Sequence, residues 1–462
     1  MLNVTLTPHR EFLPADADSQ KLFVMLKLRP TKQVASSRPP TTFAFVIDTS
    51  GSMNEVVTGD SQPTGRTYEA DGQDWMEVSG AGVKTKIEIV IESLQALMRS
   101  GKLSERERVA IVQFDDSAST VIGLTPATEV RKLEEALARL KEFSGGTLMG
   151  RGLRQALNVL RHQQMTSSRA ILFTDGQTFD EEECRELAGE FAASNIPITA
   201  LGVGDFNEDL LNHLSDATGG RPFHIVTENA IGGAVLITDL PDKIAEEFTL
   251  AQQEVIVNLA AIVKTVKGVK LTRLVRAYPS QAEFTLEREP YPIGNAAAND
   301  ETIFILEFTI EKRPASRIRI AQLGLTYDVP GQNRRGELPP QDLVVQFVAG
   351  QSFAAQVDKE VMDYVQQCNI AQIVAEATQI AEQNPQRADE LLETARRMTK
   401  RIGNETMTES IAVAQDELRK TRQISSGTRK TVKMGSKGKT VKMGGDINDE
   451  LSDEQIRKIS GT

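Results

Sequence analysis

The sequence Phe43-Ala44-Phe45-Val46-Ile47-Asp48-Thr49-Ser50-Gly51-Ser52-Met53 joins an apolar run of β-formers to a short polar turn. The apolar run shows no polar alternation, which is typical of a central strand buried on both faces. Asp48, Ser50 and Ser52 follow at the carboxyl end of that strand, where open α/β sheets bind ligands. Carboxylate and hydroxyl oxygens with no His or Cys nearby favour a hard cation such as Mg²⁺ over zinc. A simple helix N-cap turn is the alternative for this motif taken alone.

The same stretch resembles the metal-ion-dependent adhesion site (MIDAS) of the von Willebrand factor type A (VWA) domain, whose signature is Asp-x-Ser-x-Ser. The family also uses a distal Thr and a distal Asp. Thr147 lies in the glycine-rich turn Ser144-Gly145-Gly146-Thr147, and Asp175 follows the apolar run Ile171-Leu172-Phe173-Thr174. Both residue types therefore occur in the order that the family requires, so the resemblance strengthens the prediction of a metal site.

The resemblance implies a metal site made of Asp48, Ser50, Ser52, Thr147 and Asp175. In the family the two Ser and the Thr touch the ion directly, while the two Asp act partly through water. The implied ion is Mg²⁺, with Mn²⁺ or Ca²⁺ as alternatives. Neutral hydroxyl ligands leave the ion short of negative charge, so an Asp or Glu of a partner protein can fill the open position. We therefore expect a metal-dependent scaffold for protein–protein interaction.

Enzyme motifs are not found, and we expect neither catalytic nor cofactor-binding residues. No nucleophile stands beside a base in the pattern. The Asp-x-Asp pair of dehalogenase-like phosphatases is excluded because Ser50 occupies the second position. The Gly202-Val203-Gly204 turn lacks the third glycine of a dinucleotide site. Two alternatives stay open: an enzyme or the accessory subunit of an ATPase-linked, chelatase-type or other enzyme assembly, and a structural coat or surface adhesin.

Composition places the chain among ordinary globular proteins. It has 462 residues, a hydrophobic fraction of 40% and a formal net charge of −11. The negative charge argues against a nucleic-acid-binding body, and no apolar stretch is long enough to span a membrane. The first residues lack the pattern of a signal peptide. Cys184 and Cys368 are far apart, which fits a reducing compartment. We therefore expect a cytoplasmic, bacterial-type member of the family.

Strand and helix patterns alternate after Thr41, which predicts an α/β domain with a doubly wound, mainly parallel, Rossmann-like sheet. Short strands separated by turns follow and predict a β-sandwich, which the two N-terminal strands complete. The metal domain is then an insertion within the sandwich. The expected organisation is N-terminal sandwich strands at 1–40, a VWA domain at 41–249, the rest of the sandwich at 250–350, a helical bundle at 351–423 and a disordered basic tail at 424–462.

A long polar stretch, residues 54–82, interrupts the expected VWA domain directly after the metal motif. Such a length without apolar periodicity is uncommon inside a compact domain and is often functional. Because the stretch leaves from the metal turn, we expect it to overhang the site. Contact with a partner and a floppy surface loop are equally good interpretations of this stretch.

The tail contains a repeat, since Lys430-Thr431-Val432-Lys433-Met434-Gly435 recurs as residues 439–444. Few apolar residues, many glycines and only basic charges predict disorder here. Thr431 and Thr440 each follow a basic residue and are candidates for a serine/threonine kinase. The phosphothreonine can then dock on a forkhead-associated domain in a signalling pathway. A basic solubilising linker is the alternative, and residues 451–459 are expected to form a short helix against a partner.

Overall fold

The computed structural model describes residues 1–15, 17–35, 39–58, 62–70, 73–163, 165–228, 230–350, 357–438 and 440–443. The described chain forms two compact units. One unit covers Arg38–Gln253, and the other combines described residues within Met1–Ser37 and Glu254–Thr462. In sequence, therefore, the first unit is inserted between two segments of the second.

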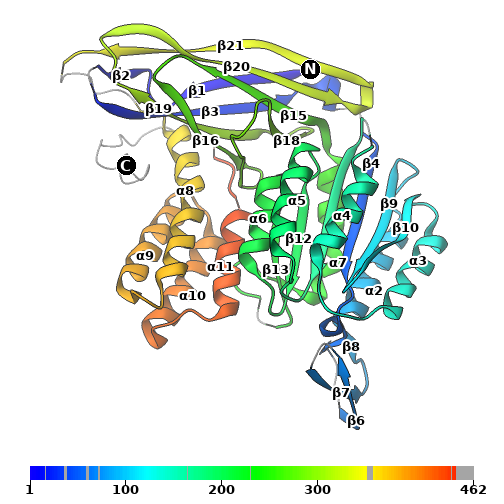
Figure 1. Cartoon of the computed structure of the whole chain (residues 1–462). Coiled ribbons are helices and arrows are strands. Elements are labelled where there is room, and N and C mark those ends of the chain that lie inside the picture. Colours follow the sequence, from blue (N-terminus) through cyan, green and yellow to red (C-terminus); the bar gives the residue numbers. More distant parts are fainter. Residues whose placement is uncertain are drawn as a thin grey trace. The chain divides into compact units, whose positions relative to one another are not determined.

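A seven-stranded sheet lies at the centre of the 38–253 unit, with the order β10-β9-β4-β11-β12-β13-β14 (Figure 1). All neighbouring strands pair in parallel except β10 and β9. Every residue of β4 is buried, because helices cover both faces of the sheet. The strands are β4 (Thr41–Asp48), β9 (Glu107–Phe114), β10 (Ala118–Pro126), β11 (Ser167–Thr174), β12 (Ile198–Val203), β13 (Pro222–Val226) and β14 (Val235–Leu236).

The helices of this unit form two layers (Figure 1). Phe43, Phe45 and Ile47 alternate with Ala44 and Val46 along β4, so the strand sends apolar side chains into both layers. Helices α4, α5 and α6 cover one face, while α2 and α7 cover the other, with α3 beside α2. Their bounds are α2 (Lys86–Arg99), α3 (Val130–Ala138), α4 (Met149–Leu160), α5 (Glu181–Ala193), α6 (Glu208–Thr218) and α7 (Leu240–Gln252), with single-turn 3₁₀ helices η1 (Gly51–Asn54), η2 (Arg139–Glu142) and η3 (Ile237–Asp239).

The polar stretch after the metal motif contains four short strands. β5 begins directly after Glu55, β8 ends at Thr85, and the two strands pair in antiparallel fashion to form a stem. β6 and β7 form a hairpin between them. Both ends of the stem therefore lie beside the carboxyl end of β4. The bounds are β5 (Val56–Thr58), β6 (Gln62–Ala70), β7 (Gln73–Ser79) and β8 (Lys84–Thr85).

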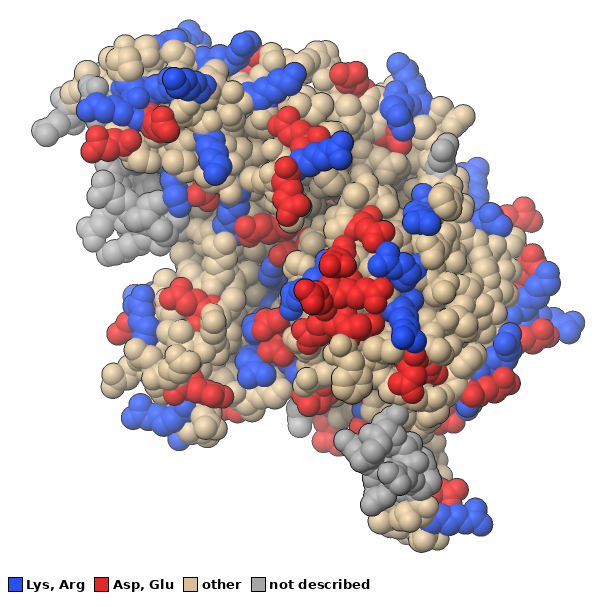
Figure 2. Space-filling model, viewed as in Figure 1, with Lys and Arg blue, Asp and Glu red and all other residues tan. Residues whose placement is uncertain are grey.

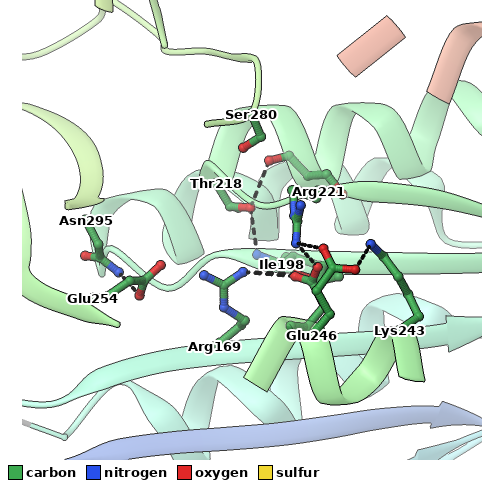
Figure 3. Close-up of polar contacts among 12 residues, drawn as sticks. Arg169, Ile198, Thr218, Arg221, Lys243, Glu246, Glu254, Ser280 and Asn295 are labelled. Atoms are coloured by element: carbon green, nitrogen blue, oxygen red, sulfur yellow. Dashed lines mark hydrogen bonds and ion pairs between the residues drawn. The ribbon is translucent and has the colours of Figure 1, made fainter. Parts of the chain in front are cut away.

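A cluster of charged side chains lies at the opposite, amino-terminal edge of the sheet (Figure 3). Glu247 of α7 is fully buried and forms ion pairs with Arg169, at the start of β11, and Arg221, just before β13. Thr199 donates a hydrogen bond of 3.2 Å to the same carboxylate. Glu246 pairs with Arg221 and with the ammonium of Lys243 but is half exposed. These contacts tie α7 to three strands of the sheet.

Two five-stranded sheets form the β part of the other unit, with the orders β1-β3-β19-β16-β17 and β18-β15-β20-β21-β2. Apolar side chains of both sheets share a single core. N-terminal strands enter both sheets: β3 pairs with β19, and β2 pairs with β21. The bounds are β1 (Leu2–Pro8), β2 (Phe12–Pro14), β3 (Ser19–Pro30), β15 (Glu254–Thr265), β16 (Val269–Tyr278), β17 (Ala282–Glu283), β18 (Tyr291–Ala297), β19 (Thr302–Glu311), β20 (Ser316–Val329) and β21 (Arg334–Val348), with short helices α1 (Lys32–Ala35) and η4 (Pro330–Gln332).

Four helices follow and pack on a second core shared with β3, β16 and β19: α8 (Lys359–Ile380), α9 (Pro385–Arg401), α10 (Glu405–Thr421) and α11 (Ser426–Gly438). Within the described parts of the chain, no helix has the length and apolar character to cross a membrane. Cys184 and Cys368 are both free and buried.

The prediction of disorder from residue 424 is wrong for Ser426–Gly438, which form α11. Val432 and Met434 are buried in this helix, so tertiary packing outweighs its glycine-rich and basic composition. Residues 440–443 follow and are bound to the same unit. Residue 439 and residues 444–462, including the expected terminal helix, lie outside the described residues.

Candidate metal centre

The carboxylate of Asp48 closes the turn that ends β4. Its Oδ1 accepts the backbone N–H of Ser50 at 2.9 Å, and its Oδ2 accepts the hydroxyl of Thr174 at 2.7 Å. β4 and β11 are adjacent, and Phe173 pairs with Ile47, so Thr174 arrives next to Asp48 at the same edge. This register brings the first loop of the candidate site beside the loop that carries Asp175.

The two motif serines and Asp175 form a continuous chain of oxygen atoms. Ser50 Oγ and Ser52 Oγ share a hydrogen bond of 3.2 Å, and Ser52 Oγ donates to Asp175 Oδ1 at 2.7 Å. Ser50 and Asp175 are buried. Residues from the β4 turn and from the end of β11 thus point into one small space.

Thr147 reaches the same space from the loop before α4. The backbone N–H of Gly51 donates to the carbonyl of Gly145 at 3.0 Å, which binds this loop to the motif turn. A Cβ on Gly176 would lie 3.7 Å from Thr147 Oγ1 and 4.0 Å from Ser52 Oγ. Both hydroxyls therefore border the space beside Gly176, and a side chain at this position would enter it.

Asp48 and Asp175 place two buried carboxyl groups close together. Burial of Asp48 and the negative charge of Asp175 raise the pKa of Asp48 to about 7, against the opposing hydrogen bonds from Ser50 and Thr174. A divalent cation among these oxygens would compensate the charge of both carboxylates.

Lys86, which the sequence analysis did not single out, supplies one positive charge here. Its ammonium lies 2.7 Å from Asp175 Oδ2 and 2.5 Å from Glu55 Oε2, and its side chain is only 6% exposed. Burial lowers the pKa of Lys86, but the charges and hydrogen bonds of Asp175 and Glu55 outweigh it and raise the pKa overall. Lys86 begins α2 directly after the Thr85 N-cap, whose capping box with Glu88 fixes the start of the helix.

The donor set fits a hard divalent ion. It consists of two carboxylates and three hydroxyls, with no sulfur or imidazole ligand. Among the residues that the structure describes, no group of three or more His, Cys, Asp or Glu side chains could hold a metal ion. An ion at this edge would therefore need the hydroxyls of Ser50, Ser52 and Thr147 beside the two carboxylates.

Asp115 follows β9 and has a local role, since its Oδ1 accepts hydrogen bonds from the N–H and hydroxyl of Ser117. The two phosphorylation candidates lie elsewhere. Thr431 and Thr440 belong to the other unit. Thr431 lies within α11, whereas the Thr440 hydroxyl donates to the carbonyl of Pro279 at 2.6 Å.

Comparisons with known proteins agree with this architecture. Residues 43–235 match the model of the von Willebrand factor type A domain, and residues 359–442 match that of the Sll0103-like C-terminal alpha-helical domain. The chain is similar to the uncharacterized protein sll0103 of Synechocystis, with 23% identity over 418 residues covering 87% of this chain and 88% of that protein.

Two solved structures show the same fold over almost the whole chain. A von Willebrand factor type A protein from Catenulispora acidiphila has 17% identity and a TM-score of 0.73, covering 95% of this chain and 97% of that one. The ArnB paralog VWA2 from Sulfolobus acidocaldarius has 14% identity and a TM-score of 0.57, covering 94% and 98%. The 43–235 region of this chain is therefore a VWA domain, and it is followed by an Sll0103-like helical domain.

Proposed function

We propose that the 38–253 unit is a metal-dependent scaffold that captures an acidic side chain of a partner protein. VWA domains commonly mediate protein–protein interaction. The observation that supports the proposal is the chain of contacts from Ser50 through Ser52 to Asp175, with the Thr147 hydroxyl bordering the same space. These oxygens come from three loops at the carboxyl edge of the sheet, where α/β folds bind ligands.

Each residue of the site has a proposed part. Ser50, Ser52 and Thr147 offer hydroxyl oxygens as direct ligands, and their neutrality leaves the ion with residual positive charge. Asp48 and Asp175 supply the negative charge, directly or through water. When bound, Mg²⁺ or a similar ion supplies a positive centre that attracts a carboxylate. An Asp or Glu of the partner completes the ligand set, so binding couples the ion to the partner.

Chelation is the test of this function. The full chain is immobilised and offered soluble proteins from its own cell in Mg²⁺, in EDTA, and in EDTA followed by excess Mn²⁺, with retained proteins identified by mass spectrometry. We expect a partner that is retained in Mg²⁺, lost in EDTA and recovered in Mn²⁺. Equal retention in all three conditions would contradict the mechanism. The buried free cysteines support a reducing, cytoplasmic setting for this experiment.

For the tail, we propose phosphorylation at Thr440 rather than Thr431. Residues 440–443 have no regular secondary structure and are held by side-chain and backbone contacts rather than by a helix or sheet, so they can open without unfolding a regular element. Thr431 lies in α11 beside the buried Lys430 and Val432. A phosphate on Thr440 removes the hydroxyl donor to the Pro279 carbonyl and adds negative charge near Asp300, which binds Lys442. Phosphorylation therefore releases the segment to a reader such as a forkhead-associated domain.

Mass spectrometry tests the tail proposal. The folded full chain is treated with a serine/threonine kinase that prefers basic sites, and its tryptic peptides are sequenced. We expect phosphate on Thr440 and none on Thr431, and the Thr440→Ala variant should stay unmodified. Phosphate on Thr431 in the folded chain, or on neither residue, would contradict the assignment.

A further inference from the structure

Phe179 is the most exposed large hydrophobic side chain among the described residues, at 86%. It lies in the loop between β11 and α5, four positions after the metal-site residue Asp175. Single exposed apolar residues are common on protein surfaces. An almost fully exposed phenylalanine next to a ligand-binding loop is different, because aromatic side chains are enriched among the residues that dominate interface energies.

Backbone hydrogen bonds fix the position of residue 179 next to the Thr147 loop. The backbone N–H of Phe179 donates to the carbonyl of Thr147 at 3.2 Å. The buried hydroxyl of the preceding Thr178 accepts the N–H of Met149 at 2.9 Å and lies 3.1 Å from the Thr147 carbonyl. The backbone on both sides of Thr147 is thus bound to the backbone that presents Phe179. Because the backbone is already ordered, a partner that covers the ring has to restrict only the two side-chain torsions of Phe179.

Other exposed hydrophobics belong to segments attached to the same edge. Met76, 56% exposed, lies in the hairpin that follows the metal motif, and Ile231, 44% exposed, lies in the loop after β13. The fourth, Val344, lies in β21 of the other unit. Three of the four large exposed hydrophobics in the described chain are therefore carried by segments that leave the carboxyl edge of the VWA sheet.

Acidic side chains gather over α5 (Figure 2), the helix that follows Phe179 in the sequence. Asp180 and the first turn of α5, Glu181–Glu183, follow Phe179 directly, and Glu186 and Glu190 continue along the helix. Arg154 pairs with Glu183 and Glu190, but carboxylates still outnumber basic groups here. This surface favours Lys or Arg on the side of the partner that faces α5.

We propose that Phe179 is the apolar anchor of the partner-binding surface. The fitting partner is a protein segment that combines three features: a carboxylate for the ion, an apolar side chain that packs on Phe179, and basic residues toward α5. The inference rests on the proposed function, because the metal-bound carboxylate sets the position of the segment. Phe179 and the acidic surface of α5 would select for apolar and basic residues in the partner, a specificity that the ion alone does not supply.

Selection from a random peptide library tests the inference. The full chain in Mg²⁺ is used as bait in three forms: wild type, Phe179→Ser and the matched control Val344→Ser, which removes an exposed apolar side chain from the other unit. We expect wild type and V344S to enrich peptides with an acidic residue, a nearby apolar residue and basic residues. F179S should still enrich acidic peptides but lose the apolar preference. A peptide selected by wild type should bind F179S about tenfold more weakly in fluorescence anisotropy.

The outcomes separate the two proposals. Suppose that wild type and F179S both select acidic peptides in an EDTA-sensitive way, with the same apolar preference and the same affinity. This result would overturn the Phe179 inference and leave the proposed function standing. Absence of any EDTA-sensitive acidic selection by the wild type would overturn both. Because Phe179 is exposed, thermal unfolding of F179S should match the wild type, and this measurement excludes misfolding as the cause of weaker binding.

Discussion

Replacing Glu247 with alanine is expected to lower the free energy of unfolding of the 38–253 unit by about 3–5 kcal/mol. The carboxylate is fully buried between Arg169 and Arg221 and also accepts the Thr199 hydroxyl. Its removal leaves the guanidinium of Arg169, whose side chain is only 6% exposed, without its buried counter-charge. Water cannot replace that partner without opening the contact between α7 and the sheet.

Thermal and urea unfolding of the full chain, followed by far-ultraviolet circular dichroism, measure this effect. Glu246→Ala is the matched control, since the neighbouring carboxylate contacts Arg221 and Lys243 but is 50% exposed. A half-exposed pair of this kind contributes about 1 kcal/mol or less. A loss for Glu247→Ala no larger than that for Glu246→Ala would show that the buried cluster does not stabilise the unit.

Substitutions of the oxygen-bearing residues and of Lys86 are expected to change the Mg²⁺ affinity of the candidate site in opposite directions. Asp48→Asn removes one of the two buried carboxylates and should weaken binding by about a hundredfold or more. Thr147→Ala removes a proposed hydroxyl ligand and should weaken binding by about tenfold. Lys86→Met removes an ammonium that lies 2.7 Å from Asp175 Oδ2. Without this competing charge, Mg²⁺ should bind about tenfold more tightly.

Isothermal titration calorimetry of the full-length variants measures these affinities. Lys84→Met is the control for Lys86→Met. It removes the same charge two positions earlier in the sequence, from a lysine that forms an exposed ion pair with Glu92. Its affinity should match the wild type. Asp48→Asn should remain folded in EDTA, since it mimics the protonated form that burial already favours by raising the pKa of Asp48 to about 7. If Asp48→Asn bound Mg²⁺ as tightly as the wild type, the proposed metal site would be contradicted.

The α/β architecture around β4 was predictable because its signals are local. An unbroken apolar run followed by small polar residues marks a buried strand and its carboxyl end, and the structure places Asp48 there. Thr147 and Asp175 were assigned by resemblance, and the structure brings Asp175 to Ser52 and Thr147 to the same space. Parallel strands align their ends, so residues that terminate different strands meet without any sequence proximity.

Long-range electrostatic partners were not predictable in this way. Lys86 meets Asp175 across 89 positions, and Arg169 meets Glu247 across 78, with no periodic pattern to connect them. α11 was missed for a related reason: Val432 packs in the helical core and Met434 is buried, but a composition rich in Gly and Lys predicts neither contact. Each of these features depends on tertiary contacts rather than on local preference.

The chain passes between its two units at two points, just before Thr41 and just after Gln252. Both lie at the amino-terminal edge of the seven-stranded sheet, where β4 begins and where Glu247, near the end of α7, meets Arg169 and Thr199. The eight residues of β4 separate this edge from Asp48 by about 25 Å. The candidate metal site therefore lies one strand length from the two points where the chain enters and leaves this unit. A longer or shorter β6–β7 hairpin would alter the surface beside the candidate site and leave both connections between the units unchanged.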